Sequence, residues 1–131
     1  MRKAIHYFLI LGCLGYSLTV MTGCVPLIVG AAAGASGVTY VRGKLERNVD
    51  HDVKHVHGAT LKALKDIEVY VKTDVMGLHD AKITAEFADG KKVTINILAL
   101  TERASKIRIR VGMIGDEMKS NVILNAIQKR L

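Results

Sequence analysis

The chain has 131 residues, a length that fits one domain and excludes a multidomain enzyme, a two-domain nucleotide-binding fold and a repeat solenoid. Its 19 Lys and Arg residues outnumber its 12 Asp and Glu residues, which gives a net charge of +7, yet half of the chain is hydrophobic. These two properties are separated along the sequence. No Lys, Arg, Asp or Glu lies between Lys3 and Arg42, whereas the remainder has the mixed composition of a folded domain.

Residues 1–23 have the organisation of a secretory signal peptide. Arg2 and Lys3 precede an apolar stretch, residues 4–20, and small residues follow it. The tetrapeptide Met21-Thr22-Gly23-Cys24 resembles a bacterial lipobox, whose cysteine becomes the lipidated first residue of the mature chain. We therefore predict a lipoprotein signal peptide over residues 1–23 and lipidation, including a palmitate-type acyl chain, at Cys24.

The two cysteines limit the chemistry of the mature chain. Cys13 would leave with the signal peptide and the lipid would cap Cys24, so no thiol or disulfide would remain. Acyl chains bind membranes through their buried methylene groups. Because Val25, rather than Asp, follows the cysteine, we predict an outer-membrane lipoprotein with its domain in the periplasm. A plain transmembrane anchor with an incidental cysteine is the alternative.

Residues 24–47 are predicted to be the lipidated cysteine and a Gly/Ala-rich tether. Gly30 and Gly34 have the spacing that allows membrane helices to approach closely, so a glycine-faced helix in the bilayer is a second interpretation. A third is a helical hairpin in which residues 4–23 and 25–41 both span the membrane. The hairpin would place the domain in the cytoplasm.

Residues 48–131 are predicted to be an α+β domain. A first helix, with Asp50 as its N-cap, is indicated by apolar residues at a period of 3.6, and a last helix begins at about Asp116. Four stretches between the helices alternate between apolar and polar residues, and Asp89-Gly90 indicates a tight hairpin. The apolar stripe of the first helix consists of Val49, Val53, Val56, Thr60, Ala63, Leu64 and Ile67. The four strand segments are residues 69–72, 81–87, 93–97 and 106–111. The buried stripe of the last helix consists of Ser120, Ile123, Leu124, Ile127 and Leu131.

This pattern predicts a two-layer sandwich. The four strands form an antiparallel meander with one apolar face and one wet face. Because each helix has a single apolar stripe, the N-terminal and the C-terminal helix should both cover the apolar face.

The chain resembles a family of small bacterial lipoproteins catalogued as a domain of unknown function. The resemblance lies in the tether and in residues 40–45, 59–64, 89–95 and 110–117. Its most specific part is the segment Arg-Val-Gly-x-x-Gly-Asp-Glu that ends at Glu117. The resemblance implies an envelope lipoprotein with an α+β domain and implies no reaction.

Strand parity places six cations on the wet sheet face, opposed by Glu68 and Glu86. They are Lys72, Lys82, Lys92, Lys106, Arg108 and Arg110. Such a face can bind an anionic envelope polymer, for example a lipopolysaccharide core, or an acidic partner protein. A solvated face whose lysines protect the sheet edges is the alternative. With only Tyr70 among the charges, single-stranded nucleic acid is not an expected partner.

Other residues offer weaker candidates for chemistry. His51 and His55 share a helical face and can hold a metal with Asp52 or His79, but the sequence lacks a third ligand at fixed spacing, so we predict hydrated side chains. Residues 112–117 could cradle an anion, but their two carboxylates favour helix capping, with Arg110 pairing with Asp116. Of Ser36, Ser105 and Ser120, none lies in a nucleophile motif.

We therefore expect a non-catalytic cell-envelope lipoprotein without a cofactor or metal, acting as a binding or scaffold module. The alternative function is a carrier of a small apolar ligand, which would occupy a pocket between the sheet and the helices.

Overall fold

The computed structural model describes residues 37–131. The predictions on residues 1–23, on Cys24, on Gly30 and Gly34 and on Ser36 lie outside the described residues. So does the helical hairpin, except for residues 37–41 at the end of its second span, of which Thr39–Val41 form a strand. The part predicted as tether is described only from residue 37 onward.

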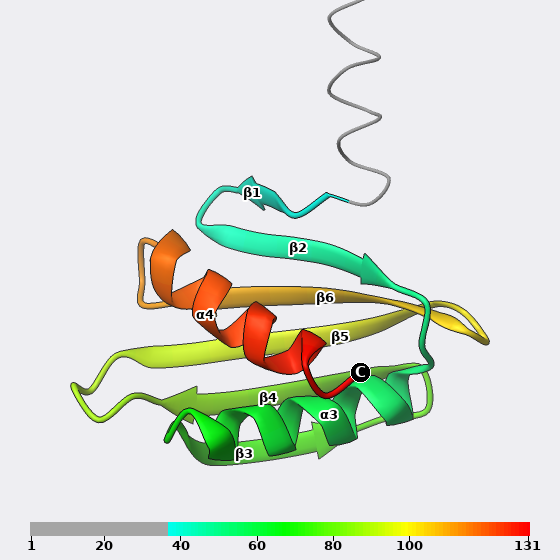
Figure 1. Ribbon diagram of the computed structural model, residues 1–131, viewed down its shortest axis with the longest axis horizontal. Coiled ribbons are helices and arrows are strands. Elements are labelled where there is room, and N and C mark those ends of the chain that lie inside the picture. Colours follow the sequence, from blue (N-terminus) through cyan, green and yellow to red (C-terminus); the bar gives the residue numbers. More distant parts are fainter. Residues whose placement is uncertain (1–36) are drawn as a thin grey trace, which may run out of the picture. The chain divides into compact units, whose positions relative to one another are not determined.

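The described residues form one antiparallel sheet and two helices (Figure 1). The sheet has the strand order β1-β2-β6-β5-β4-β3, so the last four strands in sequence form a meander and the first two extend it beyond β6. The elements are β1 (Thr39–Val41), β2 (Lys44–Val49), α3 (Val53–Asp66), β3 (Tyr70–Met76), β4 (Asp80–Glu86), β5 (Lys92–Thr101), β6 (Ala104–Val111) and α4 (Glu117–Gln128).

The prediction of a four-stranded meander is wrong, because the sheet has six strands. Residues 39–47, which were assigned to the tether, form β1 and most of β2, and β2 pairs with β6 from Leu45 opposite Ile109 to Val49 opposite Ser105. The apolar alternation in β2 is weak, because its two buried residues, Leu45 and Val49, are separated by the half-buried Arg47 at the position where a third apolar residue would stand. Val49 also fits the helical period, which hid its place in a strand.

Helix α3 begins three residues after the predicted cap. Its N-cap is Asp52 rather than Asp50, and the Asp52 side chain makes no capping hydrogen bond. The preceding turn is fixed from the sheet instead, because the hydroxyl of Ser105 donates to the carbonyl of His51 at 2.7 Å. At the other helix the predicted start is confirmed: Asp116 is the N-cap of α4 and accepts from the backbone N–H of Lys119.

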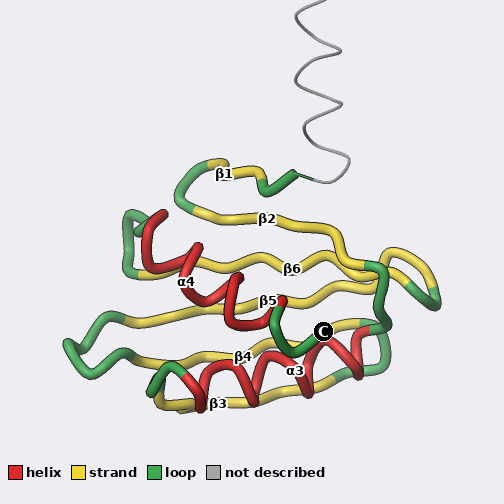
Figure 2. The backbone as a smooth tube through the Cα atoms, viewed as in Figure 1, coloured by secondary structure: helices red, strands yellow, loops and turns green. Residues whose placement is uncertain are grey.

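Both helices cover the same face of the sheet, as predicted for a two-layer α+β sandwich (Figure 2). Helix α3 contacts β3, β4, β5 and β6, helix α4 contacts β6 and β2, and the two helices contact each other. The strands send alternate side chains into this layer, where the largest fully buried residues are Leu45, Val56, Leu64, Ile83, Val93, Ile95, Ile97, Ile107, Ile109, Ile123, Leu124 and Ile127. The other face, which we call the outer face, is covered by no helix of residues 37–131.

One close backbone contact joins the β1–β2 turn to the loop between β6 and α4. Gly43 and Gly115 both have positive φ, +75° and +104°. A Cβ atom on Gly43 would overlap the carbonyl of Ile114, and one on Gly115 would overlap the backbone of Gly43. Both positions therefore require glycine for conformation and for space.

Replacing Gly115 by Ala is expected to lower the free energy of unfolding more than replacing Gly112 by Ala. Both glycines have positive φ, which costs another residue about 1–2 kcal/mol. A Cβ at Gly112 meets no atom within 4 Å, whereas one at Gly115 overlaps Gly43. Chemical denaturation of the full chain measures both losses, and equal losses would show that the close contact adds nothing.

Candidate functional site

The outer face carries the cations that strand parity predicts there. One lies in a bulge, two are engaged by neighbouring groups, and three form no ion pair with the described residues. Lys82 lies between the buried residues Ala81 and Ile83, and Arg108 lies between Ile107 and Ile109, so both side chains point away from the helices. Lys92, Lys106 and Arg110 follow the same alternation on β5 and β6.

Lys72 lies on this face at an irregularity in the edge strand. The pairing of β3 with β4 shifts between Val71 and Thr73, which places Lys72 in a bulge. Its Nζ lies 3.8 Å from Oε2 of Glu86, and both side chains are partly exposed to solvent. Alternation from Val71 predicts this orientation of Lys72, and the bulge changes the parity of the residues that follow, so that Thr73 lies opposite Thr84.

Two of the cations are engaged in local structure. Nε of Arg108 lies 2.9 Å from Oε1 of Glu46, its neighbour on β2, and Arg110 donates from Nη2 to the carbonyl of Met113. Periodicity does not indicate strand β2, so it cannot predict Glu46 as a partner of Arg108. Glu68, by contrast, was assigned to this face but lies in the turn after α3 with φ +57°.

The remaining three cations, Lys82, Lys92 and Lys106, form no ion pair with any of residues 37–131. The central strands between them present uncharged polar groups. Asn96 lies opposite Lys82 on one side and Arg108 on the other, and Thr94 lies opposite Arg110. The outer face therefore combines free ammonium groups with amide and hydroxyl groups, all of which can contact an anion.

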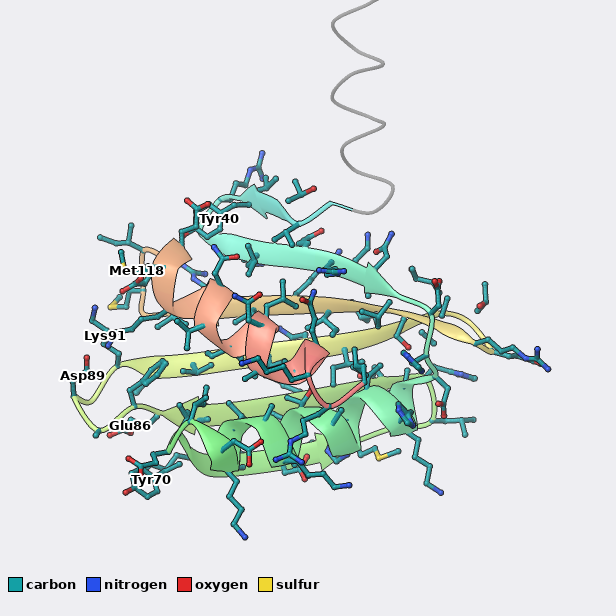
Figure 3. All side chains as sticks on the ribbon, viewed as in Figure 1. Tyr40, Tyr70, Glu86, Asp89, Lys91 and Met118 are labelled. Carbon is teal, nitrogen blue, oxygen red and sulfur yellow. The ribbon has the colours of Figure 1, made fainter. Side chains whose placement is uncertain are left out.

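The turn of residues 112–117 has a structural role in the described contacts. Asp116 caps α4, and its Oδ2 accepts from Nζ of Lys91 at 3.0 Å, so the predicted pair with Arg110 is wrong. Lys119 continues this cluster: its ammonium pairs with Asp89 and lies 4.6 Å from the centre of the Phe87 ring. The four charged side chains hold the β4–β5 hairpin against the start of α4 (Figure 3 labels Asp89 and Lys91).

The histidine and serine candidates have ordinary local contacts. The rings of His51 and His55 stack with centroids 4.8 Å apart, and no group of three possible metal ligands occurs among residues 37–131. Nε2 of His57 lies 2.6 Å from Oδ1 of Asp74, which links α3 to the edge strand β3. Ser120 is buried as predicted, and its hydroxyl donates to the carbonyl of Asp116.

Within the described part, neither helix has the length and apolar character needed to cross a membrane. A comparison with family models matches residues 7–130 to proteins of unknown function, DUF3568. The chain belongs to this family. No curated protein matches it. The resemblance to a family of unknown function is thereby confirmed, and membership in DUF3568 assigns no reaction.

In this member of DUF3568, the cluster at the start of α4 affects the titration of its carboxylates. The backbone N–H of Lys119 and the ammonium of Lys91 lower the pKa of Asp116 below its ordinary value of 3.8. The ammonium of Lys119 and the backbone N–H of Lys91 likewise lower the pKa of Asp89. Because the folded state lowers both values, the cluster stabilises the fold above the ordinary pKa, and this stability is lost as pH falls through the lowered values.

The double variant Asp89→Asn, Asp116→Asn is expected to melt at a lower temperature than the wild type at about pH 6, because neutral amides lose the ion pairs. The difference should shrink as the pH falls through the lowered pKa values, where the wild-type carboxylates become protonated. Thermal denaturation over this pH range measures it. Asp50→Asn is the control, since Asp50 makes no ion pair with the described residues. A gap between double variant and wild type that does not change with pH would contradict the expectation.

Proposed function

We propose that this chain is a non-catalytic bacterial cell-envelope lipoprotein whose outer face binds an anionic envelope polymer or an acidic envelope protein. The observation that carries the proposal is the set of free ammonium groups of Lys82, Lys92 and Lys106 on a sheet face that no described helix covers. Ammonium groups on flexible stems adapt to phosphates at irregular spacing, as in a polymer.

Two properties of the outer face support a binding role over a merely solvated surface. Its central residues are half-buried neighbours on the long strands β5 and β6, which fix their backbone positions firmly. Two carboxylates of this face, Glu46 and Glu86, are already engaged by Arg108 and Lys72. Asp80, at the start of β4, is a third and forms no ion pair with residues 37–131, so the three free ammonium groups still outnumber it. The positive charge that remains is therefore available to a ligand.

The sequence of residues 1–24 supports the proposed location. The charged start, the apolar stretch and the small residues before Cys24 favour export and lipidation, and Val25 favours the outer membrane, with the domain facing the periplasm. The helical hairpin predicts the opposite side of the inner membrane, so a test of lipidation separates the two. Four surface grooves of residues 37–131 each have charged side chains in their lining, so they do not support the apolar-ligand carrier.

Radiolabelled palmitate is expected to enter the wild-type chain and to be absent from Cys24→Ala. An inhibitor of the lipoprotein signal peptidase should then cause the precursor to accumulate, because cleavage precedes Cys24. Cys13→Ala is the matched control and should label like the wild type. Full-length, unlabelled wild-type chain in the inner membrane would contradict the proposal and favour the hairpin.

The triple variant Lys82→Gln, Lys92→Gln, Lys106→Gln is expected to bind soluble polyphosphate roughly 100-fold more weakly, because each ion contact at 4 Å in water contributes about 1 kcal/mol. Titration calorimetry on the full chain in neutral detergent measures this affinity at low salt. The control variant Lys54→Gln, Lys62→Gln, Lys65→Gln removes the same charge from α3, on the other side of the sheet. Equal weakening by both variants would show that net charge, and not the outer face, determines binding.

A further inference from the structure

Three neighbouring apolar side chains at one end of the domain are almost fully exposed. Ile114 is 90% exposed, Met113 89% and Met118 79%. Met113 and Ile114 lie in the loop between β6 and α4, and Met118 lies in the first turn of α4. None of them contributes to the core, and adjacent exposed apolar side chains of this size are typical of a contact surface.

Cations border these side chains on two sides. On one side, the backbone of Ile114 lies against Gly43, whose neighbours in the chain are Arg42 and Lys44. On the other side, a groove of about 580 Å³ is lined by Met113 together with Lys91, Lys92 and Arg110, and by Thr94 and two glycines. We call this surface the tip: Met113, Ile114 and Met118 with Arg42, Lys44, Lys91, Lys92 and Arg110.

The carboxylates around the tip are mostly engaged. Asp116 accepts from Lys91, and Asp89 pairs with Lys119, while Glu117 is exposed beside Met118. The cations of the tip therefore outnumber the free carboxylates near it. Figure 3 shows Met118 and Lys91 at the same end of the domain.

We propose that the tip docks onto the surface of an anionic lipid bilayer. Exposed apolar side chains bordered by Lys and Arg are the combination that inserts into the interface between headgroups and acyl chains while pairing with lipid phosphates. The outer face also exposes apolar side chains, such as Tyr70 and Val75, but these are five residues apart on the edge strand β3. At the tip, by contrast, Met113 and Ile114 are adjacent in the chain and Met118 follows in the next turn, so the tip fits a lipid surface better.

The connection to the rest of the chain supports a lipid surface as the occupant. The chain enters the described domain at Gly37, and β1 leads directly into Arg42 at the tip. Five residue steps of extended chain span about 17 Å. An anchor within residues 1–36, as in the proposed function on which this step rests, therefore raises the effective concentration of lipid at the tip and makes weak contacts effective.

The absence of Trp from the chain allows a direct test. Ile114→Trp places a single fluorescent reporter on the tip. Leu78→Trp is the matched control, because Leu78 is equally exposed, at 87%, but lies in the β3–β4 connection at the other end of the strands. Both full-length variants are reconstituted into vesicles of phosphatidylcholine and phosphatidylglycerol with brominated acyl chains, and only vesicle-bound protein, recovered by flotation, is measured.

The Trp of Ile114→Trp is expected to shift its emission to shorter wavelength and to lose most of its intensity to the bromine atoms, while the Trp of Leu78→Trp does neither. Equal quenching of both reporters, or no quenching of Ile114→Trp, overturns the proposal. A blue shift without quenching indicates that a second copy of the chain covers the tip, which overturns it as well.

The cations are tested in the Ile114→Trp background. Arg42→Gln with Lys44→Gln should lower the ratio of docked to undocked tip roughly 25-fold, since each cation near an anionic surface changes partitioning about fivefold. Pure phosphatidylcholine vesicles should weaken docking in the same direction. If neither the two substitutions nor the neutral vesicles weaken docking, the proposed role of the cations in docking is overturned. Because the vesicles hold the chain by reconstitution, this result does not depend on acylation of Cys24 or on polyphosphate binding.

Discussion

The sheet has one apolar face, and the rest of the architecture follows from this constraint. Ile83, Ile95, Ile107 and Ile109 all point to the same side, while the residues between them are polar. Each helix also has one apolar stripe, so both helices must share that side of the sheet. No helix of residues 37–131 covers the opposite side, and among these residues its charges are therefore accessible.

Residue periodicity predicted the elements in which the apolar signal is long. Strands β4 to β6 alternate over several residues, and Asp89-Gly90 gives the turn between two of them, so the meander and the layer order could be derived. Strand β2 has only Leu45 and Val49 in the core, and its pairing with β6 is a contact between distant segments. A periodicity argument contains no information on such a partner, which explains why the six-stranded sheet was missed.

The same distinction applies to the candidate site. Alternation gave the direction of Lys82, Lys92 and Lys106, but it could not give the pairing of Arg108 with Glu46, which depends on the missed strand. Nor could it show that two segments of the family resemblance, one with Gly43 and one with Gly115, meet in space. In the folded chain, both positions need glycine for the same contact, because a Cβ atom at either one would overlap the backbone of the other segment.

The pairing of β2 with β6 also bears on how the domain forms. Strands β3 to β6 each lie beside their neighbours in sequence, so they can assemble from local contacts. The β1–β2 hairpin must wait for β6, since Leu45 finds its place only opposite Ile109. Contacts between such distant segments slow folding, because a long loop must close before they form. The hairpin at the start of the domain is thus synthesised well before the strand that positions it, and a chain cut short before β6 has no ladder onto which that hairpin can pair.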